Sequence, residues 1–304
     1  MHNIILDTDP GIDDAVAMAV LLKACGEQVR LVVTGYGNVS LEKTTRNAMS
    51  LLALFDAGIP VIRGAQGPGP GNAAWEDASY VHGGDGLGGL QSSDLLKNLP
   101  VRQAMEGDYL QILYDAIVQC GSVDYITLGP LTNLSALIAR FPDAVRRLRR
   151  VVTMGGGIGL GNVTQFAEFN FYCDAESARH VLSTVPTLVL VPLNVTSQVY
   201  FSMEQIAAIG CVGTPVAKAM EAMLAANYHF CLACGDAGAV VHDATAVLAY
   251  LCPELFEFRT CGIRVECGKE RYGESVAARG GNVRLAAAVE AERVLGMVGE
   301  SLLY

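Results

Sequence analysis

The sequence predicts one α/β domain over residues 1–304, in which helices cover both faces of a mostly parallel central sheet. Short β-branched and apolar runs alternate with longer runs of helical period, which is typical of parallel strands joined by helices. Hydrophobic residues make up 51% of the chain, which is ample for a large core. Neither a repeat nor a linker-like segment divides the 304 residues.

The elements can be placed in order along the chain. Ile4-Ile5-Leu6 suits a short buried strand, and Pro10-Gly11 forces a tight turn after it. From Asp13 onward the apolar residues recur with a helical period. Further strands are expected at residues 31–34, 61–62, 125–128, 151–154 and 187–191, and further helices at 41–55, 110–118, 131–139, 175–182 and 244–251. This order of elements is Rossmann-like.

The segment 63–100 is too long for a simple connection. It contains the run Gly67-Pro68-Gly69-Pro70-Gly71. Two interpretations stay open: a flap over a site, or an insertion.

Composition excludes several classes of function. A net charge of −10 and a pI near 5.0 argue against binding to a nucleic acid polymer. No apolar run suits a membrane span, and no export signal is apparent, so we expect a cytoplasmic protein with no membrane partner. Nine cysteines then suggest reduced thiols. For Cys231 and Cys234 we favour two helical thiols over a zinc site.

Four carboxylates follow the first strand, in Asp7-Thr8-Asp9-Pro10-Gly11-Ile12-Asp13-Asp14. Charged residues are only 17% of the chain, so this density is not an accident of composition. Carboxylates this close repel one another, and burial increases the cost. A helix N-cap and solvated turn residues would explain one or two of them. A hard divalent cation with oxygen ligands is the simplest explanation for all four.

Two known acidic motifs can be compared with this spacing. An EF-hand loop fails at Gly11, Ile12 and Met18, where it needs an acid or amide, a glycine and a glutamate. A phosphohydrolase of the haloacid-dehalogenase type also begins with strand-Asp-x-Asp, with Asp7 as its nucleophile. That interpretation gives no reason for Asp13 and Asp14, and it stays as the enzymatic alternative.

Other polar residues follow the expected strands, at the sheet edge where ligands bind in such folds. Each asparagine alone is typical of a turn or a cap, but their shared edge favours a site. The glycine tract after Met154 matches no nucleotide-phosphate motif. His242-Asp243, taken alone, is typical of a surface histidine beside an N-cap. The other residues at this edge are Asn38, the run from Gly129 to Asn133, Asn162, Glu168 and Asn170.

Together these residues resemble the inosine–uridine-preferring nucleoside hydrolases. The shared pieces occur in the family's order over residues 7–243, and the acidic opening motif is highly specific. The resemblance implies the nucleoside hydrolase fold and cleavage of the N-glycosidic bond of small-molecule ribonucleosides. The pieces are Asp7 to Asp14, Gly37-Asn38-Val39, His82-Gly83, Gly129-Pro130-Leu131-Thr132-Asn133, Met154-Gly155-Gly156, Ala167-Glu168-Phe169-Asn170 and His242-Asp243.

The resemblance also implies one Ca²⁺ per subunit and a role for each residue. Asp9, Asp14 and Asp243 would supply carboxylate ligands, and Leu128 a carbonyl ligand. Asp13 would take a proton from a metal-bound water, and His242 would protonate the leaving base. Residues implied in substrate binding are Asn38, His82, Met154, Asn162, Glu168, Phe169 and Asn170.

Base preference is expected to depend on residues 228–241. Tyr228, our candidate for base binding, and its neighbours His229 and Phe230 could stack on a base or pack a helix, and both readings stay open. The pattern is most similar to the broad-specificity bacterial ribonucleoside hydrolases, so inosine and uridine are the expected substrates. The resemblance also implies a homodimer or homotetramer.

Two departures from the family pattern stand out. Asn194 follows Pro192-Leu193 where the family often has aspartate, which leaves the metal ligands intact but changes their surroundings. Cys173-Asp174-Ala175-Glu176 replaces a more usual Asp-Pro-Glu, with a consequence only for helix capping. A catalytically silent nucleoside-binding protein is a further alternative, although binding alone needs no base such as Asp13.

Overall fold

The computed structural model describes residues 2–69 and 75–303; Pro70 and Gly71 of the Gly-Pro run lie outside these residues. Ten strands are present in the described residues. They are β1 (Asn3–Thr8), β2 (Val29–Thr34), β3 (Val61–Arg63), β4 (Val123–Thr127), β5 (Leu148–Met154), β6 (Leu188–Val191), β7 (Tyr200–Phe201), β8 (Ala239–Val240), β9 (Phe256–Val265) and β10 (Ser275–Val289).

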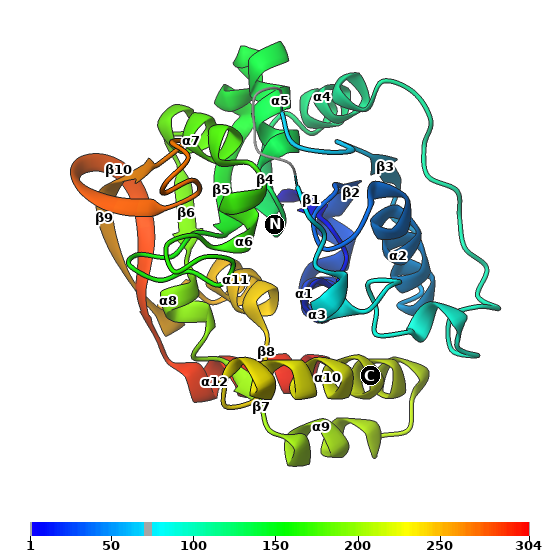
Figure 1. The fold of residues 1–304 in the computed structure, drawn as a ribbon. Coiled ribbons are helices and arrows are strands. Elements are labelled where there is room, and N and C mark those ends of the chain that lie inside the picture. The colour runs from blue at the N-terminus through cyan, green and yellow to red at the C-terminus, as the bar shows by residue number, and fades with distance from the viewer. Residues whose placement is uncertain (1, 70–74, 304) are drawn as a thin grey trace.

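Eight of the strands form one sheet in the order β3-β2-β1-β4-β5-β6-β10-β9 (Figure 1). All its neighbouring strands run parallel except β9 and β10, which form a long antiparallel hairpin at one edge. Strands β7 and β8 pair separately. The predicted fold class, a mostly parallel α/β sheet, is confirmed.

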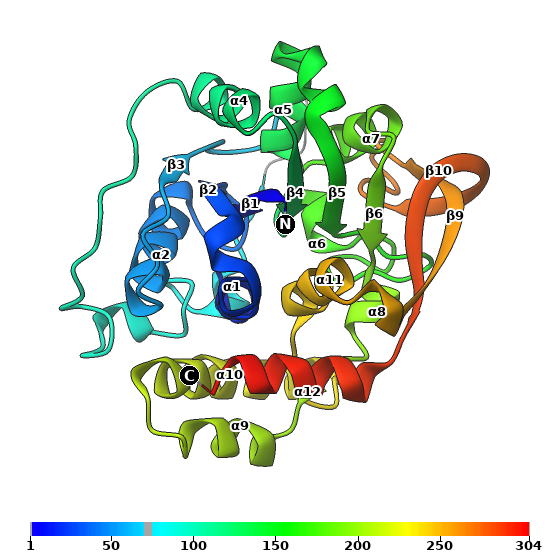
Figure 2. The same ribbon diagram turned by 180° about the vertical axis from the view of Figure 1, so that it is seen from behind.

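Helices cover both faces of this sheet (Figures 1 and 2). One face carries α1 (Ile12–Cys25), α2 (Leu41–Leu54), α10 (Pro215–Cys234), α11 (His242–Leu251) and α12 (Ala291–Ser301). The other carries α4 (Tyr109–Cys120), α5 (Thr132–Arg140) and α7 (Ala175–Thr184). Shorter helices are α3 (Ser79–His82), α6 (Phe169–Cys173), α8 (Leu193–Thr196) and α9 (Met203–Gly210), with 3₁₀ turns η1 (Gly26–Gln28), η2 (Leu90–Ser92), η3 (Pro142–Arg147) and η4 (Pro253–Leu255).

The central strand β1 shows why the sheet is buried on both sides. Successive side chains of a strand point to opposite faces. Ile4 and Leu6 accordingly belong to the hydrophobic cluster under α1, whereas Ile5 belongs to the cluster under α4 and α5. A continuous apolar run is therefore required here, and alternation with polar residues would not suit this strand.

The order of the strands determines where a ligand can bind. From β1 the chain adds β2 and β3 on one side, and then returns to place β4, β5 and β6 on the other. Loops that leave β1 and β4 in opposite directions open a crevice at the carboxyl ends of these strands. The acidic turn follows β1, and Leu128 follows β4 directly.

Each element expected from the sequence overlaps a helix or strand of the structure. The last fifty residues were not assigned, and they form the β9–β10 hairpin and α12. In the part of the chain that the structure describes, no helix combines the length and apolarity needed to cross a bilayer.

Candidate active site

The acidic turn after β1 is held by backbone N–H groups and by Asn38. The Asp14 carboxylate accepts hydrogen bonds from the Gly11 N–H at 3.0 Å and from Asn38 Nδ2 at 2.8 Å. It also accepts one from Thr8 Oγ1. Asn38 in turn donates its backbone N–H to Asp9 Oδ2 at 2.7 Å. The sequence motif therefore folds onto the loop after β2, and Asn38 ties the two loops together.

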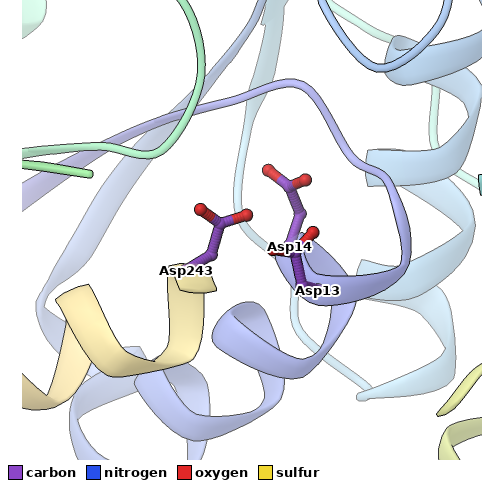
Figure 3. Close-up of side chains that lie close together, drawn as sticks. All are labelled: Asp13, Asp14 and Asp243. Atoms are coloured by element: carbon purple, nitrogen blue, oxygen red, sulfur yellow. The ribbon is translucent and has the colours of Figure 1, made fainter. Parts of the chain in front are cut away.

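Three aspartates from distant parts of the chain meet beside this turn. Asp13 and Asp14 lie in the first turn of α1, and Asp243 lies in the first turn of α11 (Figure 3). One carboxylate oxygen from each residue lies within 4.8 Å of the other two, and all three side chains are buried. Two helix N-termini meet here, and each favours negative charge through its macrodipole.

Burial and mutual repulsion make these carboxylates hard to ionise. Burial and the charge of Asp14 raise the pKa of Asp13 to about 7. The pKa of Asp243 is raised well above its usual range by burial and by the charges of Asp13, Asp14 and Asp9. Burial also raises the pKa of Asp14, although hydrogen bonds from Thr8 and Gly11 partly offset this.

The donor set fits a bound cation. No lysine or arginine is among the described residues that line the adjoining cavity. These lining residues therefore offer no cationic side chain that would keep the three carboxylates ionised, and a bound cation would supply that charge. Carboxylate oxygens are the ligands of hard divalent ions.

Asp9 and the Leu128 carbonyl lie at the edge of this cluster. Asp9 is buried, and its charge contributes to the raised pKa of Asp243, but Asp9 is not one of the three closest carboxylates. The Leu128 carbonyl accepts a hydrogen bond from Asn170 Nδ2 at 2.7 Å. A carbonyl oxygen has two lone pairs, so this bond leaves one free for a further partner.

A cavity of about 700 Å³ opens beside the aspartates. It gathers residues from both ends of the sequence, and most of the residues implied by the resemblance line it. Asp14, Asp9 and Tyr228 do not line it. Those that do are Asp13, Asn38, His82, Leu128, Met154, Asn162, Glu168, Phe169, Asn170, His242 and Asp243.

The loop after β5 brings Glu168 and Asn170 into the cavity. Glu168 is the N-cap of α6, and its carboxylate accepts backbone N–H groups of Asn170 at 2.8 Å, Phe171 at 3.1 Å and Gly156 at 2.7 Å. Asn162 lies further out and accepts the Phe169 N–H at 2.9 Å. Burial raises the pKa of Glu168, and the three N–H groups oppose that shift.

Comparison with known proteins agrees with this geometry. The family profile "Inosine-uridine preferring nucleoside hydrolase" matches residues 4–296. The chain belongs to this family. Family membership confirms the predicted enzyme class, a nucleosidase that acts on N-glycosyl bonds.

Relatives agree over most of the chain. It is 36% identical to a non-specific ribonucleoside hydrolase RihC of Klebsiella pneumoniae (strain 342), over 86% of this chain and 83% of the relative. It is 34% identical to a RihC of Salmonella enteritidis PT4, over 99% and 98% of the two chains.

Solved structures also agree. A plant nucleoside hydrolase is 28% identical, with a TM-score of 0.90 over 99% of each chain. A purine-preferring ribonucleoside hydrolase from Gardnerella vaginalis has the same fold, at 22% identity and a TM-score of 0.90, over 99% of this chain and 98% of that one.

Two histidines of this nucleoside hydrolase face the cavity. His82 is buried, and its Nδ1 accepts the Ile12 N–H at 3.1 Å, so Nε2 carries the proton at neutral pH. His242 Nδ1 lies 2.8 Å from Thr196 Oγ1. Burial lowers the pKa of His242 to about 4, and burial together with the charge of His242 lowers that of His82 to about 4. Both imidazoles are therefore neutral at pH 7.

Described residues of the segment 63–100 line part of the cavity. Tyr80 and His82 of α3 line it, and Tyr80 contacts Phe230 with ring centroids 5.9 Å apart. Tyr228 packs against the larger hydrophobic cluster instead, so the cavity aromatic from α10 is Phe230. Sequence reasoning missed Asn227, the buried polar residue of α10 that lines the cavity; a lone amide on an apolar helix face was the available signal.

Proposed function

We propose that this chain hydrolyses ribonucleosides, with inosine and uridine as leading substrates, to the free base and ribose in a Ca²⁺-dependent reaction. The observation that carries the proposal is the buried cluster of Asp13, Asp14 and Asp243 beside a cavity that also holds Glu168 and Asn170. The cluster offers oxygen ligands, and Glu168 and Asn170 offer groups that can bind hydroxyls.

Asp9, Asp14, Asp243 and the Leu128 carbonyl would hold the cation. When bound, Ca²⁺ would lower the pKa of a water molecule and orient it toward the sugar. Four hydrogen-bond donors, which include the Asp9 N–H at 3.3 Å and Asn38, fix the Asp14 carboxylate in place for binding the cation.

Asp13 would act as the general base. It lines the cavity, whereas Asp14 is not among the lining residues. Asp13 takes a proton from the attacking water as the oxygen forms a bond to the anomeric carbon and the carbon–nitrogen bond breaks. Glu168, Asn170, Asn162 and Asn38 would hold the ribose hydroxyls, and the carboxylates would stabilise the oxocarbenium character of the transition state.

His242 would supply the proton that the leaving base needs. In this proposal Thr196 donates to Nδ1, which leaves the Nε2 proton directed at the base. A neutral imidazole cannot give up this proton without becoming an imidazolate, so the donor must be the imidazolium. The negative charge that develops on the base as the bond breaks raises the pKa of the His242 imidazolium, so the ring takes up a proton from solvent and passes the Nε2 proton to the base.

The phosphohydrolase alternative is less compatible with the structure. Asp7 does not line the cavity among the described residues. Its carboxylate is buried and accepts hydrogen bonds from Tyr125 Oη at 2.7 Å and Asn133 Nδ2 at 2.8 Å. A carboxylate held in this way is not free to attack a phosphoryl group.

Two further expectations belong to the proposal. All nine cysteines lack a disulfide, which suits a cytoplasmic enzyme with reduced thiols. We expect a homodimer or homotetramer, which light scattering would test.

A product assay tests the function. Purified protein is incubated with inosine, adenosine, guanosine, uridine, cytidine and xanthosine, with calcium and after chelation by EGTA, and free ribose is measured as reducing sugar. We expect release from inosine and uridine that EGTA abolishes and calcium restores. Release from no ribonucleoside would overturn the proposal, and release of phosphate from a monoester would favour the alternative. Calorimetric binding without turnover would indicate the catalytically silent protein.

A further inference from the structure

The glycine tract after β5 begins the loop of residues 155–170, which we call the ribose loop. This loop carries Asn162, Glu168 and Asn170. Three successive residues at its start are fixed by side chains and backbone from two distant segments, α8 and the turn end of the β9–β10 hairpin.

Ser275, the first residue of β10, holds Gly157. Its buried hydroxyl accepts the Gly157 N–H at 2.9 Å and donates to the Gly157 carbonyl at 3.2 Å. One hydroxyl can both accept and donate, so both polar groups of Gly157 are satisfied by one side chain.

Asn194 of α8 holds the next residue in the same way. Its Oδ1 accepts the Ile158 N–H at 2.8 Å, and its Nδ2 donates to the Ile158 carbonyl at 3.1 Å. The neighbouring Leu193 N–H donates to the Gly156 carbonyl at 2.9 Å. Gly156, Gly157 and Ile158 are therefore held from outside the loop.

The hairpin also pairs with both ends of the loop. Ile158 pairs with Ser275, and Ala167 pairs with Glu274. The connection to the site is direct, because the Gly156 N–H donates to Glu168 at 2.7 Å and Glu168 caps the helix that carries Asn170.

Close packing explains the glycines at this point. Gly156 has φ +68°, and a Cβ there would lie 2.9 Å from Ser275 Oγ and 3.0 Å from a ring atom of Phe171. A Cβ on Gly157 would lie 2.1 Å from the Leu160 carbonyl oxygen. The glycines let the backbone approach Ser275 and Asn194, which we call the clamp. This packing role explains the glycine tract without a bound phosphate, in agreement with the absence of a phosphate-binding motif.

We propose that Ser275 and Asn194 are positioning residues, which hold the ribose loop so that Glu168 and Asn170 meet the sugar hydroxyls. The amide at position 194 is essential to this role. An aspartate, common in the family at this point, accepts from the Ile158 N–H but sets an oxygen against the Ile158 carbonyl. In this proposal the departure from the family pattern at Asn194 serves to hold the ribose loop.

The proposal concerns loop geometry, and only its catalytic consequence rests on the proposed function. The test uses Ser275→Ala and Asn194→Asp in the full chain. Asn194 is exposed, so its variant keeps the test informative if the buried Ser275 variant does not fold. One matched control is Ser183→Ala, since the Ser183 hydroxyl donates to the His180 carbonyl. The other is Asn282→Asp on the same hairpin as Ser275, since the Asn282 amide donates to the Pro186 carbonyl.

Hydrogen exchange followed by mass spectrometry is the first measurement. We expect amides of residues 156–158 to exchange about tenfold faster in Ser275→Ala, which removes the buried acceptor of the Gly157 N–H, and about threefold faster in Asn194→Asp, which sets an oxygen against the Ile158 carbonyl. The controls should match the wild type in this loop. Unchanged exchange in both clamp variants would overturn the proposal.

Discrimination between inosine and 2′-deoxyinosine is the second measurement. The ratio of their kcat/KM values should fall about three- to tenfold in the clamp variants, through KM for inosine, because the hydroxyl contacts are misplaced. A general loss of folded enzyme would lower kcat/KM for both substrates by the same factor and leave their ratio unchanged. Faster exchange with an unchanged ratio would refute the positioning role. Absence of any turnover by the wild type would refute the proposed function, and exchange alone would then decide whether the clamp exists.

Discussion

Two groups of residues at the cavity, which we call the acidic wall (Asp13, Asp14 and Asp243) and the ribose wall (the ribose loop, with Glu168 and Asn170), accommodate buried carboxylates in opposite ways. On the ribose wall, Glu168 accepts three backbone N–H groups of its own chain. On the acidic wall, Asp13 and Asp243 face each other and Asp14 without a cationic side chain among the described lining residues. Burial raises the pKa on both walls, but neighbouring charges raise it further only on the acidic one.

The difference shows which wall the chain completes by itself. At Glu168 three N–H donors of the chain itself oppose the rise in pKa that burial causes. Three buried carboxylates within 4.8 Å of one another are not stable together as anions, and their cost is offset only by protons or a cation. We therefore expect the ribose wall to be indifferent to the cation and the acidic wall to depend on it.

The largest expected effect is on the acidic wall. Asp13→Asn removes the proposed base and should lower kcat by about 10³- to 10⁴-fold, within the range of general-base catalysis. It also removes one repelling charge, so the metal-free variant should unfold at a higher temperature than the wild type. Steady-state kinetics and calorimetry measure both, with exposed Asp115→Asn as the control. A variant with near wild-type kcat would remove Asp13 from the mechanism.

The next effect is the pH dependence of stability in EGTA. The pKa of Asp13 is raised to about 7 in the folded protein, so between about pH 4 and pH 7 the folded state binds more protons than the unfolded state. Stability of the metal-free protein should therefore fall as the pH rises through this window, with a Tm lower by roughly 5 °C at pH 8 than at pH 5. Calcium should abolish most of that decrease. Equal slopes with and without calcium would show that the acidic wall does not bind the ion.

How much the sequence could predict differs between the walls. The acidic motif is contiguous, and strand-turn-helix signals place it at the carboxyl end of a strand. Asp13 and Asp14 could therefore be assigned to a cation site from the residues alone. Asp243 needed the family resemblance, because a lone His-Asp pair before a helix is typical of a cap. The structure brings it to α1 through the packing of α1 against α11, which no local pattern encodes.

The ribose wall was less accessible to sequence reasoning for a physical reason. Its loop is held by Ser275 and Asn194, 118 and 36 residues away from their partners. The β9–β10 hairpin lies at a sheet edge with many exposed residues, so it lacks the continuous apolar run that revealed β1. Tyr228 was ambiguous for a related reason, since helical spacing alone did not tell which side of α10 faces the cavity.

A smaller effect is expected at His242, the cavity histidine next to Asp243 on α11. His242→Ala should lower kcat by about 10²-fold for substrates whose leaving base needs a proton. Thr196→Val removes the partner of Nδ1 and should cost about fivefold, the value of one hydrogen bond. A nucleoside analogue with a good leaving group, such as p-nitrophenyl riboside, should lose little in either variant. An equal loss for both substrates would show that His242 acts in binding and does not protonate the base.

Glu168→Gln should have a smaller effect than His242→Ala, and it is the sharpest test of the comparison. A glutamine must turn its NH₂ group toward N–H donors that the carboxylate accepted, so Asn170 loses its fixed position and KM should rise about tenfold. The increase in Tm caused by calcium should match the wild type, because none of the three clustered aspartates is altered. Glu204→Gln, an exposed acid in the first turn of α9, is the matched control. If Glu168→Gln diminished the calcium effect on Tm, the two walls would form one electrostatic unit, and the ribose wall would not be complete without the cation.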